Sequence, residues 1–230
     1  MVENESGLAP SQRLRVAYLL TFVGGFLDAY TYFERGGVFA NAQTGNIVKL
    51  GIALSNGERD SYLFFLLPIL SFTLGLVTAL SIAEFLNRRG LRLVRRSVLI
   101  IEMIGLAIVG FVPLGAEWDT LANCIVSFVA AMQYEAFTTF RGEVIATTMS
   151  TGNLRKFVDN TFGWLVRKET ERASNAFMYA SILVIFTLGA FYGTRACDAF
   201  GRAAVVPAII FLGIAVAIIT HLRKKNSVQE

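Results

Sequence analysis

The chain contains an internal duplication, and its clearest mark is the tripeptide Thr-Gly-Asn at residues 44–46 and again at residues 151–153. A shift of 107 positions aligns residues 28–50 with residues 135–157 without a gap, and seven of the 23 pairs are identical. A second match, at an offset of 114, places Phe-Thr-Leu-Gly at residues 72–75 and 186–189. Repeated sequence units indicate repeated structural units. We therefore expect a single domain over residues 1–230 that holds two copies of one fold, at about 12–114 and 120–222.

The apolar residues are collected into long runs, which predicts an integral membrane protein of the all-α class. Hydrophobic residues make up 54 % of the chain and charged residues only 17 %, whereas an average soluble domain has about 25 % charged residues. A helix of about 20 apolar residues is long enough to cross the hydrocarbon layer of a bilayer. Six runs predict such spanning helices: Val16–Phe33, Tyr62–Phe85, Val98–Leu114, Thr120–Phe140, Asn175–Thr194 and Ala203–Leu222.

Two further apolar segments, Val38–Ser55 and Val144–Val166, carry the Thr-Gly-Asn copies and are interrupted by polar residues. Such polarity is costly for a helix that faces lipid. Irregular backbone persists at membrane depth only where protein buries it or where it lines a water-filled cavity. We therefore expect each segment to form a broken or re-entrant polar helix.

The distribution of lysine and arginine favours six spanning helices over eight. With six, one side of the membrane receives 16 basic residues and the other receives 5. With eight, Lys49, Arg155 and Lys156 would lie inside the membrane, and the remaining basic residues divide 9 against 9. Basic loops stay on the cytoplasmic side, so six spans with both termini in the cytoplasm are expected. Three spans in each copy is an odd number, which makes the two copies inverted repeats. The same loop residues account for the net charge of +4, and we expect no nucleic-acid partner.

Small residues recur at every fourth position in two of the predicted spans. This spacing lets helix backbones approach closely. The contact joins either the two halves of the chain or two protomers of a homo-oligomer, and the sequence leaves both arrangements open. The residues are Ser71, Gly75, Ala79 and Ala83 in one helix and Gly189, Gly193 and Cys197 in the other.

Two carboxylates occupy matched positions inside predicted spans, Asp28 and Glu135. A carboxylate at membrane depth is costly and is a candidate functional residue. These two are expected to bind a cation, relay protons or stabilise a positive group of a substrate. The alternative is structural: each is protonated, or accepts a hydrogen bond from the neighbouring polar segment. Glu102 has no acidic counterpart, and we expect it to pair with Arg95 or Arg96 at the membrane surface.

The Thr-Gly-Asn copies predict helix starts. Glycine permits unusual backbone angles, and threonine and asparagine are good N-caps, so short helices are expected to begin near Asn46 and Asn153. Their N-termini would point positive dipole ends at a common site that suits an anion or a polar neutral solute. Lys49 and Lys156 are the expected charge partners. The predicted binding residues are Asp28, Asn41, Thr44, Gly45, Asn46, Glu135, Thr148, Thr151, Gly152 and Asn153.

Residues 24–29 (Gly-Gly-Phe-Leu-Asp-Ala) are followed by Gly-Gly-Val-Phe at 36–39, by Asn41 and by the first Thr-Gly-Asn. This order resembles the signature of the YoaK-like family of bacterial inner-membrane proteins, whose function is unknown. The resemblance implies a multi-span protein of the inner membrane and supplies no substrate and no functional residue.

Taken together, these features predict a transporter or channel for a small polar or ionic solute. The first alternative is an assembly or structural protein of the membrane, in which the small-residue faces are the functional surface. A membrane enzyme is less favoured, because the spans hold no Ser/His pair. We expect neither a metal nor another cofactor, because the two cysteines and the single histidine have no metal-binding spacing.

Overall fold

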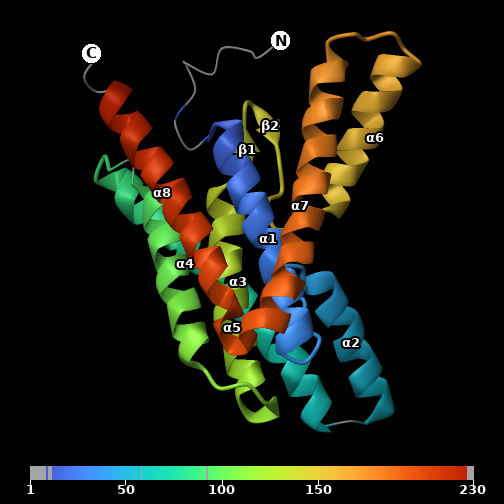
Figure 1. The fold of residues 1–230 in the computed structure, drawn as a ribbon, viewed down its shortest axis with the longest axis vertical. Coiled ribbons are helices and arrows are strands. Elements are labelled where there is room, and N and C mark those ends of the chain that lie inside the picture. The colour runs from blue at the N-terminus through green and yellow to red at the C-terminus, as the bar shows by residue number, and fades with distance from the viewer. Residues whose placement is uncertain (1–8, 10–11, 58, 92, 227–230) are drawn as a thin grey trace.

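The computed structural model describes residues 9, 12–57, 59–91 and 93–226. Helices dominate this part of the chain, which confirms the predicted all-α class (Figure 1). The elements in chain order are α1 (Leu14–Glu34), α2 (Gln43–Asn56), α3 (Arg59–Arg88), α4 (Val94–Phe111), α5 (Ala116–Ala136), β1 (Thr139–Phe140), β2 (Glu143–Val144), α6 (Thr151–Leu165), α7 (Arg172–Phe200), the 3-10 helix η3 (Gly201–Val205) and α8 (Val206–Asn226).

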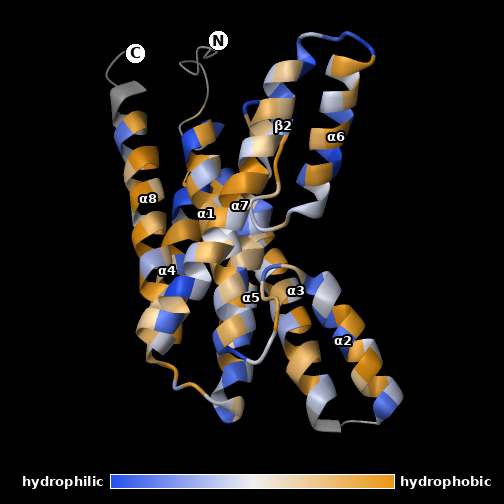
Figure 2. Ribbon diagram, turned by 45° about the vertical axis from the view of Figure 1, so that its right-hand side comes forward, coloured by the Kyte–Doolittle hydropathy of each residue, from blue (hydrophilic) through white to orange (hydrophobic). Residues whose placement is uncertain are grey.

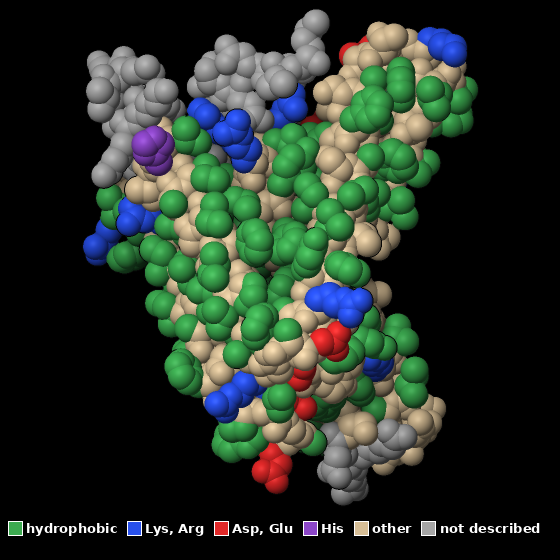
Figure 3. All heavy atoms as spheres, viewed as in Figure 1, with side chains coloured by type: hydrophobic (Ala, Val, Ile, Leu, Met, Phe, Trp, Pro, Cys, Tyr) green, Lys and Arg blue, Asp and Glu red, His purple; other side chains and the backbone are tan. Residues whose placement is uncertain are grey.

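Three helical stretches among the described residues are long and apolar enough to cross a membrane: Leu14–Glu34, Ser61–Arg88 and Arg172–Leu222, the last of which includes α7 and α8. Apolar residues cover long stretches of these helices (Figure 2). Hydrophobic side chains also occupy most of the middle of the face drawn in Figure 3, with charged side chains mainly in its upper and lower parts. These features give the chain the character of a membrane protein.

Helix packing joins the first part of the chain to the second. The most extensive helix pairs are α1 with α7 and α3 with α5. The offset of 107 that relates α1 to α5 also relates α2 to α6, and the offset of 114 relates α3 to α7. The corresponding pairs α2–α3 and α6–α7 are each in contact. Helices α4 and α8 pack against each other. In addition, α4 packs against α5, and α8 packs against α1. The main core therefore runs between the two sequence copies and not within each copy.

The small-residue faces make these contacts inside the chain. A Cβ atom added to Gly75 of α3 would lie 2.2 Å from the Phe128 carbonyl oxygen of α5. A Cβ atom added to Gly189 of α7 would lie 2.2 Å from the Phe22 carbonyl oxygen of α1. No heavy atom tolerates such a distance, so both glycines are required by the approach of two backbones. Of the two arrangements that the sequence left open, the structure shows the one between the halves.

Helices α2 and α6 are too short to cross a bilayer. Their 14 and 15 residues span about 21 to 23 Å at 1.5 Å per residue, against a hydrocarbon thickness of roughly 30 Å. Both begin near the middle of the bundle, and they run towards opposite ends of it (Figure 1). Each is a continuous helix that packs on one long neighbour, α2 on α3 and α6 on α7.

Two local predictions are wrong. The helix expected to reach Phe140 ends at Ala136, and a two-stranded hairpin follows that pairs Thr139 with Val144 and Phe140 with Glu143. Its turn residues Arg141 and Gly142 have φ angles of 51° and 80°, the left-handed values that a two-residue hairpin turn requires. The short helices do begin near the two asparagines, at Gln43 and Thr151, but Asn46 and Asn153 lie inside the helices and are not their N-caps.

Candidate functional site

Asn46 and Asn153 bind the backbone of the loop that precedes each short helix. The Asn46 side chain accepts a hydrogen bond from the Phe39 N–H at 3.3 Å and donates to the Phe39 carbonyl at 2.9 Å. Asn153 makes the same pair of bonds to Ala146, at 3.2 and 2.7 Å. Phe39 and Ala146 are themselves matched by the offset of 107. The two asparagines therefore fix the shape of two equivalent loops and do not cap helices.

The other residues of the tripeptides lie on the outside of the bundle. Thr44, Thr151 and Gly152 are exposed, and Gly45 is half-buried. The N-cap residues Ala42 and Ser150 make no side-chain capping bond. The first turn of each short helix therefore lies about halfway along the bundle but on its outer side, not in its interior (Figure 1).

The two equivalent loops meet at Gly24, in the middle of α1. The Asn41 side chain donates a hydrogen bond of 2.6 Å to the Gly24 carbonyl oxygen. From the other loop, the Thr147 carbonyl oxygen would lie 2.3 Å from a Cβ atom on Gly24, and the Thr148 Cα would lie 3.1 Å from it. Only glycine leaves room for both loops at this point.

Matched residues of the two loops each present a buried oxygen without a hydrogen-bond partner. These atoms are Asn41 Oδ1 and Thr148 Oγ1, and both side chains are at most 1 % exposed. An unsatisfied buried polar group costs about 1–3 kcal/mol. Asp28 is next to Asn41, because its Oδ1 accepts a hydrogen bond of 3.1 Å from the Asn41 N–H. The structure therefore brings three of the predicted site residues together.

Glu102 and Gln133 extend this group into α4 and α5, and the sequence interpretation missed both. Glu102 is 1 % exposed, and its carboxylate lies 3.1 Å from the side-chain amide of Gln133. The other end of that amide is 3.0 Å from the Thr147 hydroxyl oxygen. The expected pairing of Glu102 with Arg95 or Arg96 is wrong, since Arg95 donates instead to the Ala136 carbonyl. We call Asp28, Asn41, Glu102, Gln133, Thr147 and Thr148 the central polar cluster.

Glu135 and the two lysines are outside this cluster. Glu135 is half-buried in the last turn of α5. The Lys49 ammonium contacts the Gly37 carbonyl oxygen and lies 5.3 to 5.7 Å from the ring centres of Tyr32, Phe39 and Phe65. Lys156, its counterpart on α6, is exposed. A cation near three aromatic rings is stabilised there, so Lys49 has a local role in joining α2 to rings from α1, the first loop and α3.

Arg35 is the most completely buried charge among the described residues, with 0 % exposure. By its position after the first predicted span it looks like a loop residue. Its guanidinium donates to the Pro113 and Val112 carbonyl oxygens at 2.6 and 2.9 Å, and lies 3.3 Å from Asp119 Oδ1. These carbonyls follow the end of α4, where a positive charge interacts favourably with the negative end of the helix dipole. Arg35 thereby joins α1 to the junction of α4 and α5.

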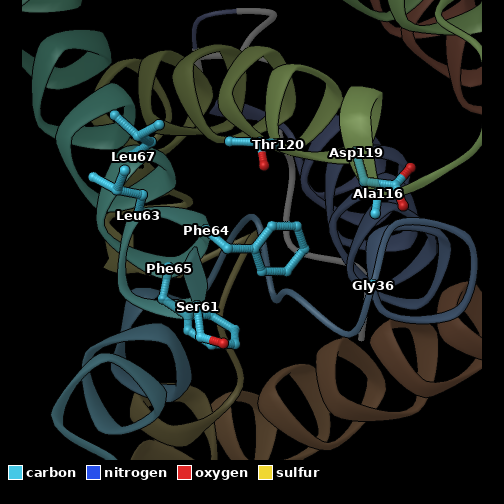
Figure 4. A pocket seen from close by; sticks show the side chains of 9 residues that line it. All are labelled: Gly36, Ser61, Leu63, Phe64, Phe65, Leu67, Ala116, Asp119 and Thr120. Atoms are coloured by element: carbon cyan, nitrogen blue, oxygen red, sulfur yellow. The ribbon is translucent and has the colours of Figure 1, made fainter. Parts of the chain in front are cut away.

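A pocket of about 560 Å³ lies beside this junction, between the first turns of α3 and α5. Figure 4 shows the Phe64 ring reaching across it, with Asp119 and Ala116 on one side and Leu63 and Leu67 on the other. Phe65 also lines the pocket and belongs to the ring set around Lys49. The wall is mostly apolar, and its one carboxylate already pairs with Arg35. This pocket is accordingly a weaker candidate for a polar solute than the central polar cluster.

Comparison with known proteins gives one match. Residues 16–218 match the family described as "Protein of unknown function (DUF1275)". Neither the curated proteins nor the solved structures that were compared contain a match. Because the matched region covers most of the 230 residues, the chain belongs to the DUF1275 family, whose function is unknown.

Proposed function

We propose that this protein moves a small polar solute across a membrane and that the central polar cluster is the site that binds it. The observation that carries the proposal is the pair of unpartnered buried oxygens, Asn41 Oδ1 and Thr148 Oγ1. They come from matched positions of two duplicated loops, and both residues lie close to Gly24 of α1. Uncompensated buried polar atoms are selected against in a purely structural core, whereas a bound solute would satisfy them.

The membrane arrangement that supports this role has six spanning helices and two re-entrant helices. Helices α1, α3, α4, α5, α7 and α8 would cross the bilayer, while α2 and α6 would enter it from opposite sides. The two copies, residues 12–114 and 120–222, would then be inverted repeats, and transporters with such repeats bind their substrates near the midplane between the halves. In this arrangement the basic loops would put both termini on the cytoplasmic side of a bacterial inner membrane.

The chemistry of the cluster favours a solute that donates hydrogen bonds. The cluster holds two carboxyl groups, an unpartnered amide oxygen and an unpartnered hydroxyl. Arg35, at the start of the first loop, is engaged by Asp119 and by the Val112 and Pro113 carbonyls. Lys49 of α2 is engaged by three rings and the Gly37 carbonyl. We therefore place hydroxyl-, amide- or ammonium-bearing solutes ahead of the anion that the helix N-termini alone would favour.

A flux assay tests this function. Proteoliposomes are given an inward gradient of glycerol, urea or methylammonium, and their volume is followed by light scattering. We expect entry of at least one of these probes to exceed that into protein-free liposomes. Replacing both Asn41→Leu and Thr148→Val should lower the rate by about tenfold or more, which corresponds to 1.4 kcal/mol, because the two free oxygens are removed.

The control variant is Thr73→Val, which removes a hydroxyl that bonds only to the Ile69 carbonyl on the exposed face of α3. Its flux should equal that of the unaltered protein. A folded Asn41→Leu/Thr148→Val protein with undiminished flux would refute the assignment of the site. Absence of flux for all three probes would favour the second candidate below.

The second candidate function is an assembly protein of the membrane without transport. What favours it is the burial of the central polar cluster, whose six side chains are all at most 7 % exposed. Solute access to these residues requires helices to move apart. The close backbone contacts at Gly75 and Gly189 would then only make the helix bundle rigid. Homo-oligomer formation would have to use other faces, since these are occupied within the chain.

A further inference from the structure

Gln133 separates a buried carboxyl group from a threonine hydroxyl and fits between them in two ways. One end of its amide lies 3.1 Å from both Glu102 Oε1 and Glu102 Oε2, and the other end lies 3.0 Å from Thr147 Oγ1. The three side chains are each 1 % exposed. A half-turn of the amide exchanges its oxygen and nitrogen without displacing any of the three residues.

The protonation state of Glu102 decides which orientation is satisfied. An ionised carboxylate only accepts hydrogen bonds, so the amide NH₂ must face it, and the amide oxygen then accepts from the Thr147 hydroxyl. A protonated Glu102 donates its O–H to the amide oxygen, and the NH₂ then donates to Thr147 Oγ1. In the second state the Thr147 hydroxyl hydrogen is released for another acceptor.

The charged groups on the surrounding elements are directed elsewhere. On α5, Asp119 pairs with Arg35; on α3, Glu84 pairs with Arg88 at the exposed end of the helix. Arg202 of η3 and His221 of α8 are exposed. On α4 itself, Arg95 donates to the Ala136 carbonyl and Arg96 is exposed. Within the described residues, Gln133 is thus the polar side chain in hydrogen-bond contact with Glu102.

The duplication does not repeat this arrangement, which joins Glu102 of the first copy to Gln133 and Thr147 of the second. Glu102 falls opposite Val216 by the offset of 114, and Gln133 and Thr147 fall opposite Phe26 and Ala40 by the offset of 107. Duplication therefore does not account for these three polar residues. The polar contact between α4, α5 and the second loop is therefore asymmetric at the place where the two halves meet.

We propose that Glu102 takes up and releases a proton, and that the Gln133 amide turns in response and reverses the hydrogen bond of Thr147. When Glu102 loses its proton to water, its carboxylate accepts a hydrogen bond from the Gln133 amide NH₂. The Thr147 O–H then donates to the Gln133 amide oxygen and no longer to an acceptor outside these three residues. When the proton returns, the Thr147 O–H is again available at the loop that carries Thr148. This inference rests on the proposed transport function, in which it makes Glu102 the residue that couples protons to solute binding.

Infrared difference spectroscopy of the purified protein in lipid nanodiscs tests the switch without any solute. As the pH is raised from about 5 to about 9, a carboxylic acid C=O band of the wild-type protein should disappear while an amide C=O band shifts. Glu102→Gln should lack that acid band. Gln133→Leu should retain the band at a changed frequency and a changed midpoint pH, because its hydrogen-bond partner is gone. Thr147→Val should alter the amide shift.

Two controls separate this signal from other carboxyl groups. Asp28→Asn removes the other buried acid of the cluster, and Glu117→Gln removes an exposed acid of α5; neither should abolish the Glu102 band. An acid band that persists unchanged in Glu102→Gln, or a band whose frequency and midpoint are untouched in Gln133→Leu, would overturn the switch. The spectra do not depend on transport, so a flux failure with an intact band change refutes the transport function and not the switch.

Discussion

Replacing Arg35 by leucine is expected to destabilise the protein by about 3–5 kcal/mol, the usual cost of removing one partner of a buried ion pair. The substitution leaves Asp119 without its cation, although that carboxylate is only 7 % exposed. It also removes the donors to the Val112 and Pro113 carbonyl oxygens. The measurement is the melting temperature of the purified protein in one detergent, together with the folded yield.

Two further variants calibrate this result. Arg35→Lys keeps the charge but loses the planar fork that serves several acceptors at once, so an intermediate loss is expected. Arg88→Leu breaks an ion pair whose side chains are 77 % and 63 % exposed, and such pairs contribute at most about 1 kcal/mol. If Arg35→Leu melts as close to the wild-type protein as Arg88→Leu does, Arg35 does not hold the junction of α4 and α5.

Replacing Gly75 or Gly189 by valine should be the second most damaging change, at about 3 kcal/mol or more. Overpacking usually costs about 1–3 kcal/mol, and here the atom that a side chain would strike is a backbone carbonyl oxygen at 2.2 Å. A backbone oxygen cannot turn aside as a flexible side chain can, so the helices α3 and α5, or α1 and α7, must separate. Thermal unfolding in detergent and protease resistance report the loss.

Gly51 supplies the matched control, because no heavy atom lies within 4 Å of a Cβ atom placed there. Gly51→Ala in α2 should be neutral or stabilising by up to about 1 kcal/mol, since alanine is the better helix former. Equal melting temperatures for Gly75→Val, Gly189→Val and Gly51→Ala would show that the small-residue faces do not carry the contact between the halves.

The sequence predicted the elements of the fold well where one local pattern determines them. Every apolar run, from Val16–Phe33 to Ala203–Leu222, contains a helix in the structure. The offset of 107 also predicted that Asn46 and Asn153 have equivalent positions, and their identical bonds to Phe39 and Ala146 agree with this. Periodicity and repetition are properties of the chain itself, so they can be recognised without coordinates.

The prediction failed where a contact depends on elements far apart in the chain. Glu102 was interpreted as an interfacial residue because its position in the run gave no sign of Gln133, 31 residues later. A glutamine inside a predicted span could itself have indicated a polar site. It was overlooked because the residue aligned with it in the first copy, Phe26, is apolar. Arg35 follows directly after the first span and looks like a loop charge, and only the packing of α4 and α5 around it shows its burial.

Asn46 and Asn153 illustrate a third case, in which the residue type was recognised and its role was not. Asparagine before a helix is a common N-cap, and that preference led to predicted helix starts near both residues. In the structure each side chain reaches back seven positions, to Phe39 and Ala146, instead of to the first turn. Which of two available hydrogen bonds an asparagine makes depends on the loop shape, and local sequence does not determine that shape.

Cysteine labelling from each side of the membrane tests whether the two halves are inverted, with their duplicated loops in one shared polar site. Single cysteines replace Ser55, at the end of α2, and Glu171, just before α7, in a chain whose Cys124 and Cys197 are serine; both introduced positions are exposed. A membrane-impermeant maleimide is applied to intact cells and to inverted vesicles. We predict that residue 55 is labelled only from outside and residue 171 only from the cytoplasmic side. Labelling of both residues from the same side would mean that α2 and α6 cross the membrane fully, and would contradict the inverted arrangement.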